Sequence, residues 1–162
     1  MIQRIQTIYL LLAVVATPVL LFFFPLAAYY SDIATLKLYL SHIQNLVPSL
    51  PLPLTLNPFL QYLGIIISII AGVICIYTIS SFKNRIKQVR LIRITLFLII
   101  LVIAWQFFIT DLIRKNLSTI PDYEIGIYMP IISLIFLLLA QRAILKDERK
   151  IRAADRLRGN MN

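Results

Sequence analysis

The sequence contains few of the residues from which catalytic and metal sites are built. It has one cysteine, Cys75, and one histidine, His42, so neither an internal disulfide nor a cysteine–histidine zinc site can form. His42 could be drawn into a catalytic triad with Asp32 and Ser31 or Ser41, but a histidine on a loop without a pocket is more commonly a solvated residue. The four glycines are too scattered to form a phosphate-binding loop. We therefore expect no enzymatic activity and no cofactor.

Charge is scarce as well. Only 14% of the residues are charged and 60% are apolar, a composition typical of a membrane protein rather than of a soluble globular domain. Four charge-free runs cover residues 5–31, 38–82, 94–110 and 125–141. At about 1.5 Å per residue, each run crosses or nearly crosses a hydrocarbon core about 30 Å thick. The prediction is a single all-α integral membrane domain, a four-helix bundle with spans at about 5–27, 59–82, 91–112 and 125–145.

The distribution of lysine and arginine predicts the orientation of these spans. One such residue precedes the first span, five lie in the loop 83–93, and seven follow from Arg142 onward. The connections on the opposite side hold three, namely Lys37, Arg114 and Lys115. By the positive-inside rule, both termini and the loop 83–93 face the cytoplasm, as in a multi-pass protein of a bacterial inner membrane. The net charge of +9 is thus a sign of topology, and we expect no nucleic-acid partner.

The outer loop 31–57 can be interpreted in two ways. Leu36, Leu38 and Leu40 alternate with polar or aromatic residues, which is typical of an extended segment. Apolar residues from Ile33 to Val47 also recur at helical spacing, which indicates a short helix on the outer face. The sequence favours the helix slightly for 32–47, followed by an extended proline–leucine segment.

Small residues in the second span form a packing stripe. Gly64, Ser68 and Gly72 are spaced four residues apart, so another helix can approach closely there. The neighbour is either another helix of the same chain, which we favour, or a second copy in a homodimer. In the third span, the Gln106 amide is expected to bond a neighbouring helix rather than to line a pore.

The charged segment 142–158 is predicted to continue the fourth span as a cytosolic tail helix. It contains good helix formers and reaches Gly159 without glycine or proline. It could be a solvated tail, a docking element for a protein partner, or a contact for anionic lipids. We also predict an ion pair between Arg4 and Asp147 or Glu148. The candidate contact residues are Arg4, Lys83, Arg85, Lys146, Asp147, Glu148, Arg149, Arg152, Asp155, Arg156 and Arg158.

Three stretches carry a family resemblance. "MIQRIQTIYLLLA", "KNRIKQVRLIRI" and "GIYMPIISLIFLLLAQRAILKDERKIRAADRLR" are similar to the small four-helix inner-membrane proteins of Bacteroidota grouped as domain-of-unknown-function family 4293. The similarity covers about half of the residues and leaves out the outer loop 31–57. It implies four membrane helices in a bacterial cytoplasmic membrane, and it implies no activity. Because its most recognisable pieces would all be cytosolic, it favours partner docking over a solvated tail.

The leading hypothesis is an accessory or scaffold subunit that sits in the lipid bilayer and docks a cytosolic or membrane protein through its cytosolic face. The alternative is a small transporter or channel. That alternative has little support in the sequence, because the spans contain almost no ionisable groups that could line a path.

Overall fold

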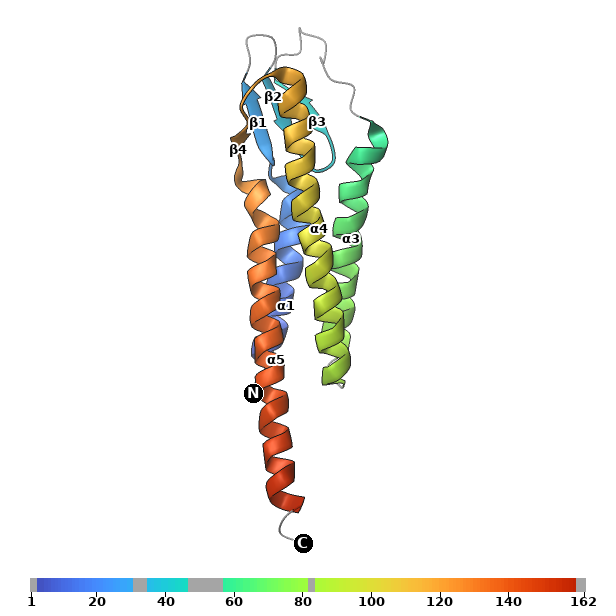
Figure 1. The fold of residues 1–162 in the computed structure, drawn as a ribbon, viewed down its shortest axis with the longest axis vertical. Helices are drawn as coiled ribbons and strands as arrows, with labels where there is room; N and C mark the ends of the chain where they lie inside the picture. The colour runs from blue at the N-terminus through green and yellow to red at the C-terminus, as the bar shows by residue number, and fades with distance from the viewer. Residues whose placement is uncertain (1–2, 31–34, 47–56, 82–83, 160–162) are drawn as a thin grey trace.

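The structure is a computed structural model that describes residues 3–30, 35–46, 57–81 and 84–159. It is mostly helical. Four long helices lie side by side along one axis, and a small sheet covers one end (Figure 1). Each of the four is long and apolar enough to cross a membrane. We call residues 26–30, 35–46 and 105–128 the sheet end, and residues 3–9, 84–93 and 142–159 the basic end.

The first long helix is built from three pieces around a proline. The α-helix α1 (Gln3–Val14) passes into a π-helical turn, η1 (Val15–Val19), and then into the short α-helix α2 (Leu20–Phe23). Pro18 lies inside the π-turn and has no N–H to donate to the carbonyl five residues earlier, that of Ala13. The Ser133 hydroxyl donates to this carbonyl instead, at 3.0 Å. The irregular turn is therefore satisfied by a neighbouring helix, as the interior of a bilayer would require.

The next two helices form an antiparallel pair. Helix α3 (Pro58–Ser80) begins with its proline at a position that needs no N–H, and the Asn57 side chain caps it by accepting from the Phe59 N–H at 3.1 Å. Helix α4 (Arg85–Leu117) is capped in the same way by Asn84, which accepts from the Lys87 N–H at 3.1 Å. The short connection between the two helices places the start of α4 at the basic end.

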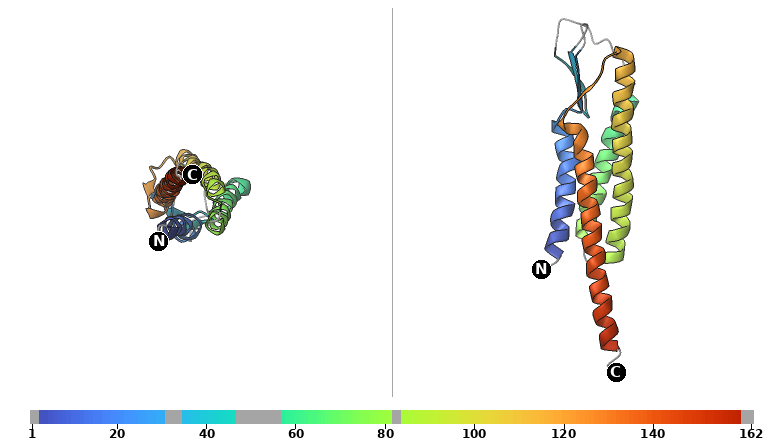
Figure 2. Two further views of the ribbon diagram at one scale, coloured as in Figure 1. Left: turned by 90° about the horizontal axis from the view of Figure 1, so that it is seen from below. Right: turned by 60° about the vertical axis from the view of Figure 1, so that its left-hand side comes forward.

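The last helix extends beyond the ends of the other three long helices. After a 3₁₀ turn, η2 (Ile125–Tyr128), helix α5 (Met129–Gly159) runs unbroken for 31 residues. Most of its length packs against α1 and α4. Its last turns project past the ends of the other helices (Figures 1 and 2). The predicted fourth span and the charged segment 142–158 thus belong to one continuous helix.

The sheet end overturns two predictions, the all-α fold and the helix over 32–47. Strands β1 (Ala27–Tyr30), β2 (Thr35–Leu38), β3 (Ile43–Asn45) and β4 (Asp122–Tyr123) form an antiparallel sheet in the order β3-β2-β1-β4. Strand β2 follows the alternating pattern of the extended interpretation, since Leu36 and Leu38 are buried while Lys37 is only half-buried. The described part of 32–47 is extended despite its helical spacing, because β2 pairs with β1, which in turn pairs with the distant β4. The predicted proline–leucine segment lies largely outside the described residues.

The sheet packs on the last turns of α4 and is tied to it by hydrogen bonds. The Tyr29 hydroxyl, fully buried, donates to the Thr110 carbonyl at 2.9 Å, and burial raises the pKa of this phenol. The Trp105 indole N–H donates to the Leu60 carbonyl of α3, also at 2.9 Å. Leu36 and Leu38 join these aromatic rings in one apolar cluster. The sheet is therefore part of the core and not a surface attachment.

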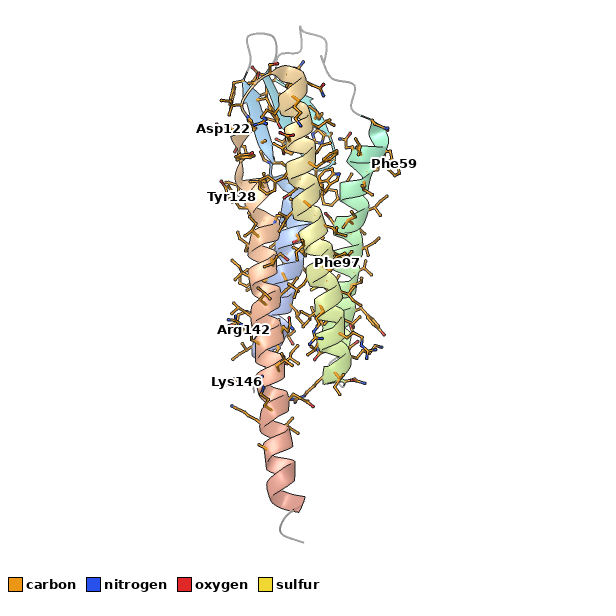
Figure 3. The ribbon with its side chains drawn as sticks, in the orientation of Figure 1. Phe59, Phe97, Asp122, Tyr128, Arg142 and Lys146 are labelled. Carbon is orange, nitrogen blue, oxygen red and sulfur yellow. The ribbon has the colours of Figure 1, made fainter. Side chains whose placement is uncertain are left out.

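The outer surface of the helical body is apolar along its middle. Phe97, on the outside of α4 at mid-height, is 61% exposed, and Val73 of α3 is 59% exposed (Figure 3). Polar side chains point inward instead, for Ser68, Thr95 and Gln106 are all buried. This distribution is the reverse of that in a water-soluble protein, whose surface rarely carries a continuous apolar band.

Candidate functional site

The basic end is the candidate site, because the structure brings three charged segments of the chain together there. Arg142 and Lys146 mark its position on α5, opposite the end that holds Asp122 and Phe59 (Figure 3). Helix α4 contributes Arg85 from its first turn. Lys83 lies outside the described residues. The structure likewise does not describe five of the predicted side chains, those of Arg4, Arg152, Asp155, Arg156 and Arg158.

A buried hydrogen bond joins the first and last helices at this end. The Gln6 amide of α1 donates to the Asp147 carboxylate of α5, and both residues are more than nine-tenths buried. A hydrogen bond to a charged group is worth about 1.5–3 kcal/mol, and leaving the carboxylate buried without it would cost more. The bond therefore fixes α5 against α1 at the point from which α5 projects. The pairing predicted for Arg4 involves a side chain outside the described set.

A groove of about 280 Å³ separates the start of α4 from α5. From α4, three arginines reach it, Arg85, Arg90 and Arg93, and α5 adds Glu148. Its remaining lining is aliphatic: Ile86, Val89, Ile144 and Leu145. The structure thus brings the predicted residues Arg85 and Glu148 to one groove. Arg90 and Arg93 were not among the predicted contact residues, although the four-residue steps from Arg85 through Val89 to Arg93 already place Arg93 on the same helix face as Arg85.

A second depression of about 590 Å³ lies along another face of α5. Its cationic lining consists of Arg142, Lys146, Arg149 and Lys150, with Leu145 and Ala153 between them. These residues recur at three- and four-residue steps, so they form a stripe on one side of the helix. The sequence predicted Lys146 and Arg149 as contacts, and the structure places both on this basic stripe.

The turn between α3 and α4 is held by polar side chains of both helices. The Gln88 amide donates to the Thr78 carbonyl at 3.1 Å, near the end of α3, where this carbonyl also accepts from the Ser81 N–H at 3.2 Å. The Lys87 ammonium donates to the Tyr77 hydroxyl at 2.6 Å. These contacts fix the first turns of α4, from which the groove arginines extend.

The small-residue stripe of α3 is occupied by side chains of the same chain. A Cβ atom at Gly64 would lie 2.7 Å from the Trp105 ring, and one at Gly72 would lie 2.9 Å from the Pro18 ring. Ser68 between them is fully buried. A second copy could reach this stripe only by displacing these rings.

The surroundings of His42 do not form a catalytic triad among the described residues. His42 is exposed, stacks on Tyr39 with ring centroids 4.8 Å apart, and lies 2.9 Å from the Ser41 hydroxyl through Nδ1. The other two triad candidates, Ser31 and Asp32, lie outside the described residues. Within the part of the chain that the structure describes, no cluster of three or more histidine, cysteine, aspartate or glutamate residues could hold a metal ion.

Comparison with known proteins identifies a family but no characterised relative. No curated protein and no solved structure matches the chain. The family model described as "Domain of unknown function (DUF4293)" matches residues 2–157, which covers the four long helices, the sheet and nearly all of the tail. The chain therefore belongs to the DUF4293 family.

Proposed function

We propose that this protein crosses the bacterial cytoplasmic membrane four times, with the basic end in the cytoplasm and the sheet end outside. The apolar outer band of the helices supports insertion, because burying such a surface in lipid removes it from water. The excess of lysine and arginine at the basic end supports the orientation.

Within that membrane, we propose a non-enzymatic accessory or scaffold role, in which the projecting end of α5 docks a protein partner. The observation that carries this proposal is that α5 continues as one helix well past the rest of the fold. A solvated helix of this length is marginal by itself, so the hydrogen bond from Gln6 to Asp147 at its root helps to hold it in place. A charged helix presented in this way suits a protein surface of complementary charge.

Crosslinking in cells tests the docking role. A photo-reactive amino acid is placed at Arg149 or Ala153, on the exposed basic stripe, and for comparison at Ile120, which is 85% exposed at the sheet end. We expect one discrete protein adduct from the two α5 positions and none from Ile120. The adduct should disappear when Arg149 and Lys150 are both changed to glutamate. Recovery of only lipid and solvent products from α5 would contradict the docking role.

Reporter fusions test the orientation separately. Fusions after residues 86 and 160 should be active with a cytoplasmic reporter, and fusions after residues 45 and 118 with a periplasmic one. An active periplasmic reporter at residue 86 would overturn the proposed topology.

A transporter or channel is the second candidate, and the buried amide of Gln106 favours it. Neither polar atom of Gln106, nor the hydroxyls of Thr17 and Ser68, has a hydrogen-bond partner among the described residues. The interior cavity beside Thr17 is only about 10 Å³, which is room for about one water molecule. Solute or ion flux in proteoliposomes, abolished by Gln106→Leu, would support transport, and flux that this substitution leaves unchanged would rule out a path through Gln106.

A further inference from the structure

The groove between α4 and α5 carries an excess of positive charge. Its lining holds three guanidinium groups and one carboxylate, which leaves an excess of two positive charges. The Nη1 atom of Arg85 is buried and has no hydrogen-bond partner among the described residues. A buried donor of this kind lowers its free energy by gaining an acceptor, most of all a charged one. The guanidinium fork matches the oxygen atoms of a phosphate.

The rest of the lining favours a ligand that is only partly polar. Val89, Ile144 and Leu145 form an aliphatic wall beside the arginines, and Ile144 is fully buried. A free phosphate or another small anion would leave this wall in contact with water. A phosphate that carries a glycerol and acyl chains would cover it.

The position of the groove agrees with such a ligand. Arg93 directly precedes the charge-free run of α4, and Arg142 directly follows that of α5. In the proposed topology, this level is that of the phosphate groups of the inner leaflet, where anionic lipids are held by basic pockets between helices.

We infer that the α4–α5 groove binds the headgroup of an anionic phospholipid, with Arg85 and Arg93 holding its phosphate and the aliphatic wall contacting its glycerol and first acyl carbons. This inference rests on the membrane insertion proposed above. It concerns a lipid site between α4 and α5, which shares only Leu145 with the lining of the basic stripe that is proposed to dock a protein.

The test measures lipid retained by the intact protein. The full chain is placed in nanodiscs of phosphatidylcholine that contain one-tenth phosphatidylglycerol, released into mild detergent, and analysed by native mass spectrometry. We expect the wild-type protein to retain phosphatidylglycerol in preference to phosphatidylcholine. The Arg85→Gln/Arg93→Gln variant should retain roughly tenfold less phosphatidylglycerol, which is the scale of a lost charge-assisted hydrogen bond. The control variant Arg149→Gln/Lys150→Gln removes the same charge from the α5 stripe and should change retention less than about twofold.

A single variant and a competition with inorganic phosphate distinguish a lipid site from misfolding and from a site for a free anion. If the double variant fails to fold, Arg93→Gln alone, at an exposed position, should still reduce retention severalfold. Equal retention by the groove and control variants, or displacement of the lipid by millimolar inorganic phosphate, would overturn the inference. Failure of the proposed function appears elsewhere, as release of the chain from membranes by alkaline carbonate, as a periplasmic reporter at residue 86, or as the absence of a protein adduct from Arg149.

Discussion

The two ends of the molecule differ in both charge and packing. By sequence, the sheet end and its connections hold three lysine or arginine residues and four acids, whereas the basic end together with Lys83 holds thirteen and three. The whole net charge of +9 therefore arises at the basic end, which with Lys83 carries +10. At the sheet end, the cations are matched: Arg114 and Lys115 lie 2.9 and 2.7 Å from Asp111, and Lys37 lies 4.0 Å from Glu124.

Packing differs in the same direction. At the sheet end, residues of β1, β2 and β3 pack with the end of α4 in one apolar cluster, while at the basic end α5 extends past its neighbours and exposes the α4–α5 groove and the depression along its basic stripe. The sheet end is thus closed by its own packing and ion pairs, whereas the basic end keeps an excess of positive charge and open surface for a ligand. This difference is the reason for placing both proposed contacts, protein and lipid, at the basic end.

The largest expected effect comes from breaking the closed end. Trp105→Ala removes a ring that packs on Gly64 and donates a hydrogen bond to Leu60, so it should destabilise the fold by about 3–5 kcal/mol. Phe108→Ala is the control on the same helix, because Phe108 is 55% exposed and should face lipid. Thermal unfolding in detergent compares the two variants. Similar losses from both would mean that the sheet end is not the tightly packed part.

A smaller effect is expected from the buried hydrogen bond that joins α1 to α5 at the basic end. Gln6→Leu leaves the Asp147 carboxylate buried without its donor and should cost about 1–3 kcal/mol. The double variant Gln6→Leu/Asp147→Leu replaces both partners by apolar groups and should recover most of this loss. A double-mutant cycle of unfolding free energies measures the coupling between the two residues. Additive single effects would show that the two side chains act independently.

Reducing the charge difference should make the orientation less uniform without unfolding the protein. Changing Arg85, Lys87, Arg90 and Arg93 to glutamine lowers the positive charge of the connection between α3 and α4, so a fraction of the chains should insert in the opposite orientation. The matched variant changes Lys37, Arg114 and Lys115 to glutamine and should keep the orientation of the wild type. Reporter activity after residue 86 distinguishes the two, and equal activity in both variants would refute the role of the basic end.

The smallest effect is expected from the matched charges at the sheet end. Asp111→Asn removes the partner of Arg114 and Lys115, but all three side chains are substantially exposed and water screens their attraction. Tm should fall by no more than about 2 °C. A loss comparable to that of Trp105→Ala would show that charge pairing, and not apolar packing, holds this end together.

Prediction from the sequence was most successful where structure is local. A charge-free apolar run becomes a helix through bonds within itself, so the four membrane-length helices could be recognised from the runs alone. The sheet could not, because β1 lies at and just past the end of the predicted first span and β4 follows it by about ninety residues. The pairing energy of such strands depends on partners that no local pattern reveals.

The residues of the candidate site were likewise predicted only in part from the sequence. The sequence alone identified Arg85, Asp147 and Glu148 as charged residues at one level of the molecule. That Gln6 is the described partner of Asp147, and that Arg90 and Arg93 share a groove with Glu148, followed only from the packing of α1 and α4 on α5.

By itself, then, the sequence determined the four long helices, the charge difference between the two ends and the family, because hydrophobic length, charge count and motif are properties of consecutive residues. Only the tertiary structure decided the sheet, the occupant of the small-residue stripe of α3 and the α4–α5 groove, because each depends on which distant residues come within a few ångströms of one another.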